Sequence, residues 1–256
     1  MTYCLAINTN EGLVLCSDSR TNAGFDNVST YNKMHTFSWL NNRFITILSS
    51  GNLATTQQVL KKIQTDIDKG FLPNLLSVNS MHEAIDYIAS VSTTIQNVHV
   101  VRDASNTSFQ ATFIVAGQIG SDKPETCLIY PQGNYIHESD EHPYIQIGET
   151  KYGKPILDRI ISRETSLNRA ARCALVSMNS TIRSNLTVGP PIDLMLYEKN
   201  SLAAGRKLHL TEDDAFAKEL SEKWNNGLIN ALMSLPKFEW EQQDQINSQN
   251  IHQNVN

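Results

Sequence analysis

Hydrophobic and polar residues alternate through the first fifty positions in the way that β-strands require. Residues 2–9 (TYCLAINT) and 13–18 (LVLCSD) flank the sequence NEG, whose glycine suits a tight turn. This pattern predicts a β-hairpin. The polar stretch from Arg20 to Asn32 predicts irregular structure. Residues 33–40 and 43–50, joined by Asn-Asn, predict a second hairpin.

After residue 51 the spacing of apolar residues becomes helical and predicts a helix over residues 52–69. Ser80 and Glu83 have the spacing of a capping box and predict the start of a second helix. The two periods then predict strands at 109–118, 126–131, 134–138 and 143–148, helices at 152–162 and 166–183, strands at 192–199 and 206–210, and a helix at 213–234.

The order of these elements indicates the fold class. Helices do not alternate one by one with strands, which argues against a parallel sheet. We expect an α+β protein, a four-layer αββα sandwich of two antiparallel sheets between helix layers, in one domain over residues 1–240. Nine of the last 16 residues are Asn or Gln, so residues 241–256 are predicted to be a disordered tail.

Composition narrows the function classes. The net charge of −5 and the absence of a basic run argue against nucleic-acid binding. No apolar stretch approaches the roughly 18 residues of a membrane span, and no signal peptide is visible, so we expect a cytoplasmic protein without membrane contact. The four cysteines form no CxxC pair and the seven histidines no HExxH motif. We therefore expect buried free thiols, no metal and no cofactor.

The N-terminus carries the candidate chemistry. No P-loop, GxGxxG or GxSxG motif occurs in the chain. Aminopeptidases remove Met1 when a small residue such as Thr2 follows, and removal exposes an α-amine beside the threonine hydroxyl. The ordinary pKa of an α-amine is about 7.7–8.0, so this amine can act as general base for its own hydroxyl.

Three further residues have the character that such a nucleophile needs. Asp18 ends the strand that pairs with the strand bearing Thr2, and Lys33 begins the next strand. Gly51 lies in SSGN at a strand-to-helix junction, where backbone N–H groups can stabilise an oxyanion. Each residue alone has an ordinary explanation, as a solvated lysine, a turn aspartate or a helix start. Their combination favours a catalytic site.

The motifs that surround these residues resemble the proteasome β-subunit family. Thr2, SDSRTNAG (17–24), Lys33 and SSGNLATTQ (49–57) follow its pattern, and SNLTVGPPIDLMLYE (184–198) extends the resemblance to its bacterial subfamily called Anbu. The resemblance implies the N-terminal-nucleophile (Ntn) hydrolase fold and a bacterial threonine peptidase or amide hydrolase.

The resemblance also implies roles for single residues. Thr2 would be the nucleophile, and Lys33 would supply positive charge. Asp18 would orient Lys33, and the Gly51 N–H would bind the oxyanion. Arg20 would brace its loop. We expect a specificity pocket near Arg20, Tyr31 and Ser49.

The chain departs from the family pattern beside the nucleophile. The family carries a further Asp and Ser there, and SNLTVG (184–189) places Ser184 or Asn185 at the Asp and Thr187 at the Ser. In GETKYG (148–153), Glu149 or Thr150 replaces another Ser. We therefore expect an altered hydrogen-bonding shell. A weakly active or inactive assembly or scaffold protein is the alternative.

The resemblance implies partners as well. Proteins of this class act on peptide or protein substrates inside rings or stacked homo-oligomers, and the helices at 166–183 and from Asp213 are candidate contact surfaces. Both helices could instead simply cover their own sheet. Whether an ATP-dependent unfoldase delivers substrate is left open by the sequence.

Overall fold

The two hydrophobic periods produce the predicted succession of strands and helices in the computed structural model, which describes residues 2–22, 28–102 and 108–241. The elements are β1 (Tyr3–Thr9), β2 (Gly12–Asp18), β3 (Arg20–Asn22), β4 (Val28–Thr30), β5 (Met34–Trp39), β6 (Arg43–Gly51), α1 (Leu53–Lys69), α2 (Met81–Arg102), β7 (Ala111–Ile119), β8 (Glu125–Ile129), β9 (Tyr135–His137), β10 (Tyr144–Gly148), α3 (Lys154–Ile160), α4 (Leu167–Ser184), β11 (Ile192–Glu198), β12 (Arg206–Leu210) and α5 (Ala215–Met233).

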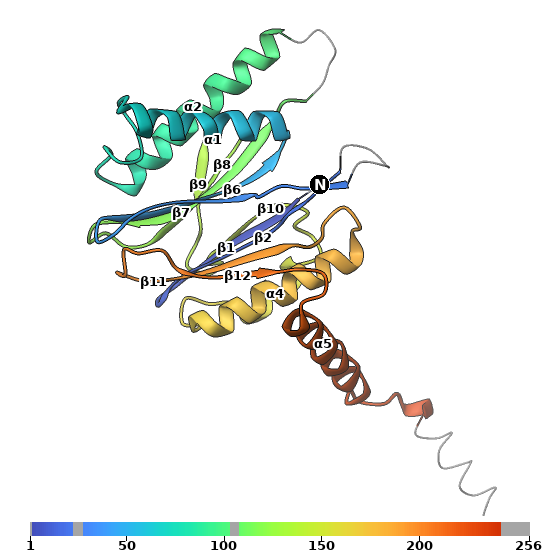
Figure 1. Cartoon of the computed structure of the whole chain (residues 1–256). Helices are drawn as coiled ribbons and strands as arrows, with labels where there is room; N and C mark the ends of the chain where they lie inside the picture. The colour runs from blue at the N-terminus through green and yellow to red at the C-terminus, as the bar shows by residue number, and fades with distance from the viewer. Residues whose placement is uncertain (1, 23–27, 103–107, 242–256) are drawn as a thin grey trace, which may run out of the picture. The chain divides into compact units, whose positions relative to one another are not determined.

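Two antiparallel sheets form the centre of the fold. One has the strand order β10-β1-β2-β11-β12 and the other β5-β6-β7-β8-β9. Helices α1 and α2 cover the outer face of the second sheet, as Figure 1 shows, while α4 packs on β1, β2 and β11 and contacts α3. The predicted α+β class and the αββα order of layers are confirmed.

Apolar residues fill the spaces between the layers. Between the sheets lies a cluster that includes Ala6, Leu15, Phe44 and Met195. The apolar stripe of α1, with Val59 and Ile63, packs in a second cluster with residues of α2 and the sheet beneath. Burial of these faces, at about 25 cal/mol per Å² of apolar surface, is the main force that holds the two sheets and their helices in place.

Strand register brings distant residues to one end of the first sheet. Tyr3 pairs with Gly148 of β10, and Cys4 pairs with Ser17 of β2. On the other side of β2, Asp18 pairs with Ile192. The start of β1 and the end of β2 therefore lie beside the end of β10, which places Thr2 and Asp18 close together.

Two local predictions were wrong in part. The stretch from Arg20 to Asn32 contains the antiparallel pair β3–β4, with Arg20 opposite Thr30. These strands have three residues each, too few to show a hydrophobic period. At the start of α2, Ser80 Oγ accepts from the Glu83 N–H at 3.2 Å, but Glu83 Oε2 accepts from the Asn79 N–H at 2.8 Å. The Ser80 half of the capping box is therefore as predicted, whereas the Glu83 side chain accepts from Asn79 and not from Ser80.

The chain divides into two compact units, Met1–Asp214 and Ala215–Asn256. Helix α5 in the second unit buries none of its residues. The predicted single domain over residues 1–240 stays a prediction. Of the tail predicted to be disordered, residues 241–256, only Glu241 belongs to the described residues, and it is helical. No helix in the described part of the chain has the length and apolarity to cross a membrane.

Candidate active site

A buried ion pair lies at the end of the first sheet. Lys33 Nζ is 2.7 Å from Asp18 Oδ1 and donates to the Arg20 carbonyl oxygen, also at 2.7 Å. Asp18 is fully buried and Lys33 is 6% exposed. The predicted pairing of these two residues is therefore present in the structure, and the lysine head has an anionic and a carbonyl acceptor.

Backbone groups complete the environment of Asp18. The Tyr3 N–H donates to Oδ1 at 2.9 Å and the Gly189 N–H donates to Oδ2 at 3.3 Å. Burial raises the pKa of the Asp18 carboxyl, whereas the Lys33 ammonium and the two N–H donors favour its charged form. Removal of any one of these partners would leave a buried charge poorly compensated.

Thr2 lies beside this pair at the start of β1 and is 8% exposed. Its carbonyl oxygen accepts from the Glu149 N–H at 2.8 Å. Gly148 permits this approach, because it has φ +83° and a Cβ there would lie 1.9 Å from the Thr2 carbonyl oxygen. The strand register and one glycine therefore fix the backbone of the candidate nucleophile.

Thr2, Lys33 and Gly51 line one cleft of about 690 Å³. Gly51 is the last residue of β6, directly before Asn52, whose side chain caps α1 by accepting from the Thr55 N–H at 3.1 Å. Gly51 has φ +110°, and a Cβ there would lie 2.3 Å from the Gln110 carbonyl oxygen. The structure thus brings three of the four predicted catalytic residues to one cavity, with Asp18 behind Lys33.

Arg20 does not line this cleft. Its Nη1 donates to the Leu186 carbonyl at 2.9 Å, and its guanidinium lies so close to Gly189 that a Cβ there would be 2.3 Å from Cζ. Arg20 therefore connects β3 to the loop after α4. Tyr31 and Ser49 do line the cleft, so the expected specificity pocket contains two of its three named residues.

The departures from the family pattern form a second cluster beside Thr2. Asn185 Nδ2 donates to Glu149 Oε2 at 2.8 Å, and Thr187 Oγ1 donates to Asn185 Oδ1 at 2.6 Å. The sequence left open Ser184 or Asn185 at one position and Glu149 or Thr150 at the other. In the structure, Asn185 and Glu149 are hydrogen-bonded to each other. Ser184 is an exposed residue at the end of α4, and the Thr150 carbonyl accepts from the Lys154 N–H within its own loop.

Tyr3 is a supporting residue that sequence reasoning missed. Besides its N–H bond to Asp18, its hydroxyl lies 2.6 Å from Ser177 Oγ and accepts from Gln146 Nε2 at 2.5 Å. A tyrosine in an apolar strand gives no sequence signal beyond a core position. The contact across 174 residues to α4 is visible only in three dimensions.

No group of three or more His, Cys, Asp or Glu side chains in the described segments could hold a metal ion. The four cysteines are free and buried, as predicted.

Comparisons with known proteins agree with this geometry. The family model "Proteasome subunit" matches residues 2–195. "Proteasome subunit beta 2" of Pyrobaculum calidifontis is 25% identical over 197 residues, which cover 77% of this chain and 88% of that protein. Anbu (ancestral beta-subunit) from Yersinia bercovieri has a TM-score of 0.87 and 39% identity, over 93% of this chain and 99% of that chain. The helical assembly of the Anbu complex from Pseudomonas aeruginosa has a TM-score of 0.88 and 42% identity, over 92% and 98%.

Proposed function

This chain belongs to the proteasome subunit family, and on this premise we propose that it is a threonine peptidase or amide hydrolase whose nucleophile is Thr2 after removal of Met1. The observation that carries the proposal is the buried Lys33–Asp18 pair, whose ammonium lines the same cleft as Thr2. A buried ammonium beside a hydroxyl favours the deprotonated forms of that hydroxyl and of a neighbouring amine.

The proposed reaction begins at the freed Thr2 amine. The neutral amine, directly or through a water molecule, takes the proton of Thr2 Oγ as Oγ attacks the substrate carbonyl carbon. The developing oxyanion accepts from the Gly51 N–H. The amine then returns the proton to the leaving nitrogen as the amide bond breaks. A water molecule, activated by the same amine, hydrolyses the Thr2 ester and restores the hydroxyl.

Lys33 and Asp18 serve this sequence without forming bonds to the substrate. The ammonium supplies the positive potential, which acts more strongly at a buried position than it would in bulk water. Asp18 and the Arg20 carbonyl hold that ammonium in one place. Glu149, through its N–H, holds the Thr2 carbonyl, while its carboxylate is engaged by Asn185.

A second function has one specific observation in its favour. Where the family pattern has Asp and Ser beside the nucleophile, this chain has an amide and a carboxylate bonded to each other. Such a pair gives the freed amine a different set of proton partners. A proteasome-fold assembly or scaffold protein with little hydrolytic activity is therefore the alternative.

The proposal includes self-assembly, in a bacterial cytoplasm, around peptide or protein substrates. Helix α5 buries none of its residues and exposes Phe216, Leu228, Leu232 and Met233, an apolar surface of the kind that partners cover. The apolar face of α4, in contrast, is buried on its own sheet. A particle larger than a monomer is expected in static light scattering at micromolar concentration, and a monomer would contradict self-assembly.

The direct functional test compares Thr2→Ala with Thr2→Ser in peptide hydrolysis. Thr2→Ala removes the hydroxyl and is expected to lower turnover by about a thousandfold or more, because the covalent route is lost. Thr2→Ser keeps a hydroxyl and should retain measurable turnover. Hydrolysis by Thr2→Ala at the wild-type rate would sink the proposal.

A further inference from the structure

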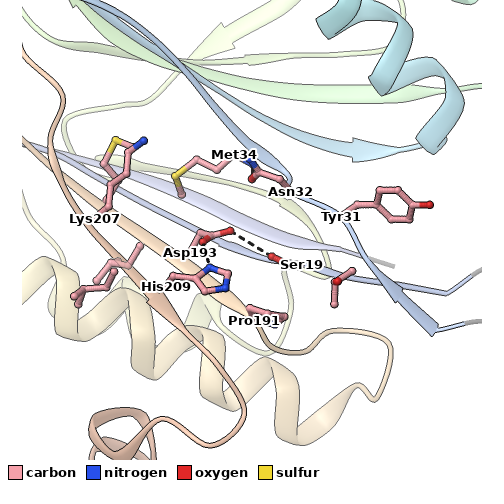
Figure 2. Close-up of a pocket in the computed structure, with 12 residues that line it drawn as sticks. Ser19, Tyr31, Asn32, Met34, Pro191, Asp193, Lys207 and His209 are labelled. Atoms are coloured by element: carbon pink, nitrogen blue, oxygen red, sulfur yellow. Dashed lines mark hydrogen bonds and ion pairs between the residues drawn. The ribbon is translucent and has the colours of Figure 1, made fainter.

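A second pocket, of about 480 Å³, opens between the edges of the two sheets (Figure 2). Its walls come from β11 and the edge strand β12 on one side and from the segment 30–34 on the other. The volume lies in the range of small-molecule sites. The pocket is separate from the cleft of Thr2 but shares Tyr31 and Asn32 with it.

The pocket is lined by chain neighbours of the ion pair. Ser19, the residue after Asp18, and Met34, the residue after Lys33, both line it. Lys33 itself lines the cleft on the other side. A ligand in this pocket would therefore touch the immediate chain neighbours of both charged residues.

Polar groups converge on the apolar walls. Asp193 Oδ1 accepts from His209 Nδ1 at 2.6 Å and Oδ2 accepts from Ser19 Oγ at 3.3 Å, and Figure 2 shows the three side chains turned toward one another. The side chain of Asp193 is 24% exposed, and each oxygen keeps a further lone pair for a ligand donor. Tyr31 and Pro191 supply accessible apolar surface, while Met34 and Met195 form the buried floor.

The charges in the pocket occur as a separated pair. Asp193 is bonded to Ser19 and His209, while Lys207 lies farther along β12. Asp193 is opposite His209 and Met195 is opposite Lys207 in the strand register. The backbone positions of Asp193 and Lys207 are thus offset by two residues, about 7 Å, along the strand direction. An extended dipeptide spans about the same length, about 7 Å.

We propose that this pocket binds a short apolar peptide as a zwitterion, with its amine on Asp193, its carboxylate on Lys207 and its side chains against Tyr31 and Pro191. A zwitterion matches both charges, whereas a plain anion or cation leaves one of them uncompensated. The inference rests in part on the proposed function, because amide hydrolysis of a polypeptide releases short peptides with both charged ends.

The test measures binding of three ligands by calorimetry to the full chain in its Thr2→Ala form, so that no turnover is needed. The ligands are Leu-Leu, N-acetyl-Leu-Leu and Leu-Leu-amide. Each cap removes one charge-assisted bond, and we expect each capped ligand to bind about tenfold weaker than Leu-Leu. Lys207→Gln should abolish the difference between Leu-Leu and its amide, and Asp193→Asn the difference between Leu-Leu and its N-acetyl form.

Lys61→Gln on α1 is the matched control, since Lys61 is exposed and lines neither pocket. Equal binding of the three ligands, no binding, or an equal loss in Lys61→Gln and Lys207→Gln would overturn the proposal. Lys207 is exposed, so its variant tests the carboxylate end even if Asp193→Asn does not fold. Because binding is measured in Thr2→Ala, the result does not depend on hydrolysis. A negative binding result would not contradict the proposed hydrolase activity, and absence of hydrolysis would not contradict peptide binding in this pocket.

Discussion

The two sides of Thr2 differ in how their polar groups are held. On one side, the charges of Asp18 and Lys33 are buried and bonded to each other and to backbone groups from β1, β3 and the loop after α4. On the other, Glu149 is 11% exposed, contacts the exposed Lys151 at 3.7 Å and receives a hydrogen bond from the neutral Asn185.

The proposed chemistry has two requirements, activation of the Thr2 hydroxyl and hydrogen bonding near its amine, and the two sides of Thr2 serve one each. In the proposed mechanism the buried pair provides the electrostatic field that activates the Thr2 hydroxyl. We expect this pair to tolerate little change, because an unpaired buried charge costs about 3–5 kcal/mol of stability. In the same proposal, Glu149 and Asn185 supply hydrogen bonds near the Thr2 amine that is exposed when Met1 is removed. Because the Glu149 carboxylate is bonded to a neutral amide and lies near only an exposed lysine, we expect this side to tolerate substitution and to adjust the rate.

Of the changes on the two sides of Thr2, Asp18→Asn has the largest expected effect. Loss of the carboxylate leaves the Lys33 ammonium without the anion that holds it in place. We therefore expect acylation of Thr2 by a β-lactone to slow by about 10² to 10³, which corresponds to about 3–4 kcal/mol of activation free energy. The rate is measured by mass spectrometry on protein whose fold is checked by circular dichroism. Asp122→Asn at an exposed turn is the control and should be unchanged. A rate within threefold of wild type for Asp18→Asn would remove the buried pair from the mechanism.

The same variant has a pH signature. Burial raises the pKa of the Asp18 carboxyl, so on acidification this group takes up a proton at a higher pH than an ordinary aspartate at about 3.9. Protonation removes the anion that holds Lys33. Wild-type acylation should therefore fall through this titration as pH decreases, whereas Asp18→Asn should lack that step.

On the other side of Thr2, substitution of Glu149 and Asn185 is expected to have a smaller effect, and to raise the acylation rate instead of lowering it. Glu149→Ser combined with Asn185→Asp introduces the residue types of the family pattern and should raise the acylation rate, by about tenfold. Asn185→Asp alone places a carboxylate against Glu149 and should lower the rate. Lys151→Gln, which changes only an exposed partner of Glu149, should alter it less than twofold. If the double variant is slower than Glu149→Ser alone and Asn185→Asp alone, the Asn185–Glu149 hydrogen bond supports catalysis as it stands.

Local patterns predicted most of the fold and the buried half of the site. The hairpin of β1 and β2 made the proximity of Thr2 and Asp18 predictable, because register follows from alternation across a short turn. The strands β3 and β4 were missed since three residues show no period. The choice of Asn185 over Ser184, and the bonds of Tyr3 to Ser177 and Gln146, depend on tertiary contacts between distant segments.

The second pocket could not be predicted from the sequence for the same reason. Ser19, Asp193 and His209 come from three separate segments, and none belongs to a motif. Only the register of β11 with β12 places Asp193 opposite His209. The sequence therefore predicts the proximity of residues on neighbouring strands, but not a pocket formed where the edges of two sheets meet.

The central claim, that Thr2 is a free N-terminal nucleophile, is tested most directly by the intact mass of the purified full chain before and after treatment with an epoxyketone or a β-lactone. The account predicts a mass lower by one methionine, then one added inhibitor per chain at Thr2 and none in Thr2→Ala. Retention of Met1, or a processed and folded chain that takes up no inhibitor, would contradict it and favour the scaffold alternative.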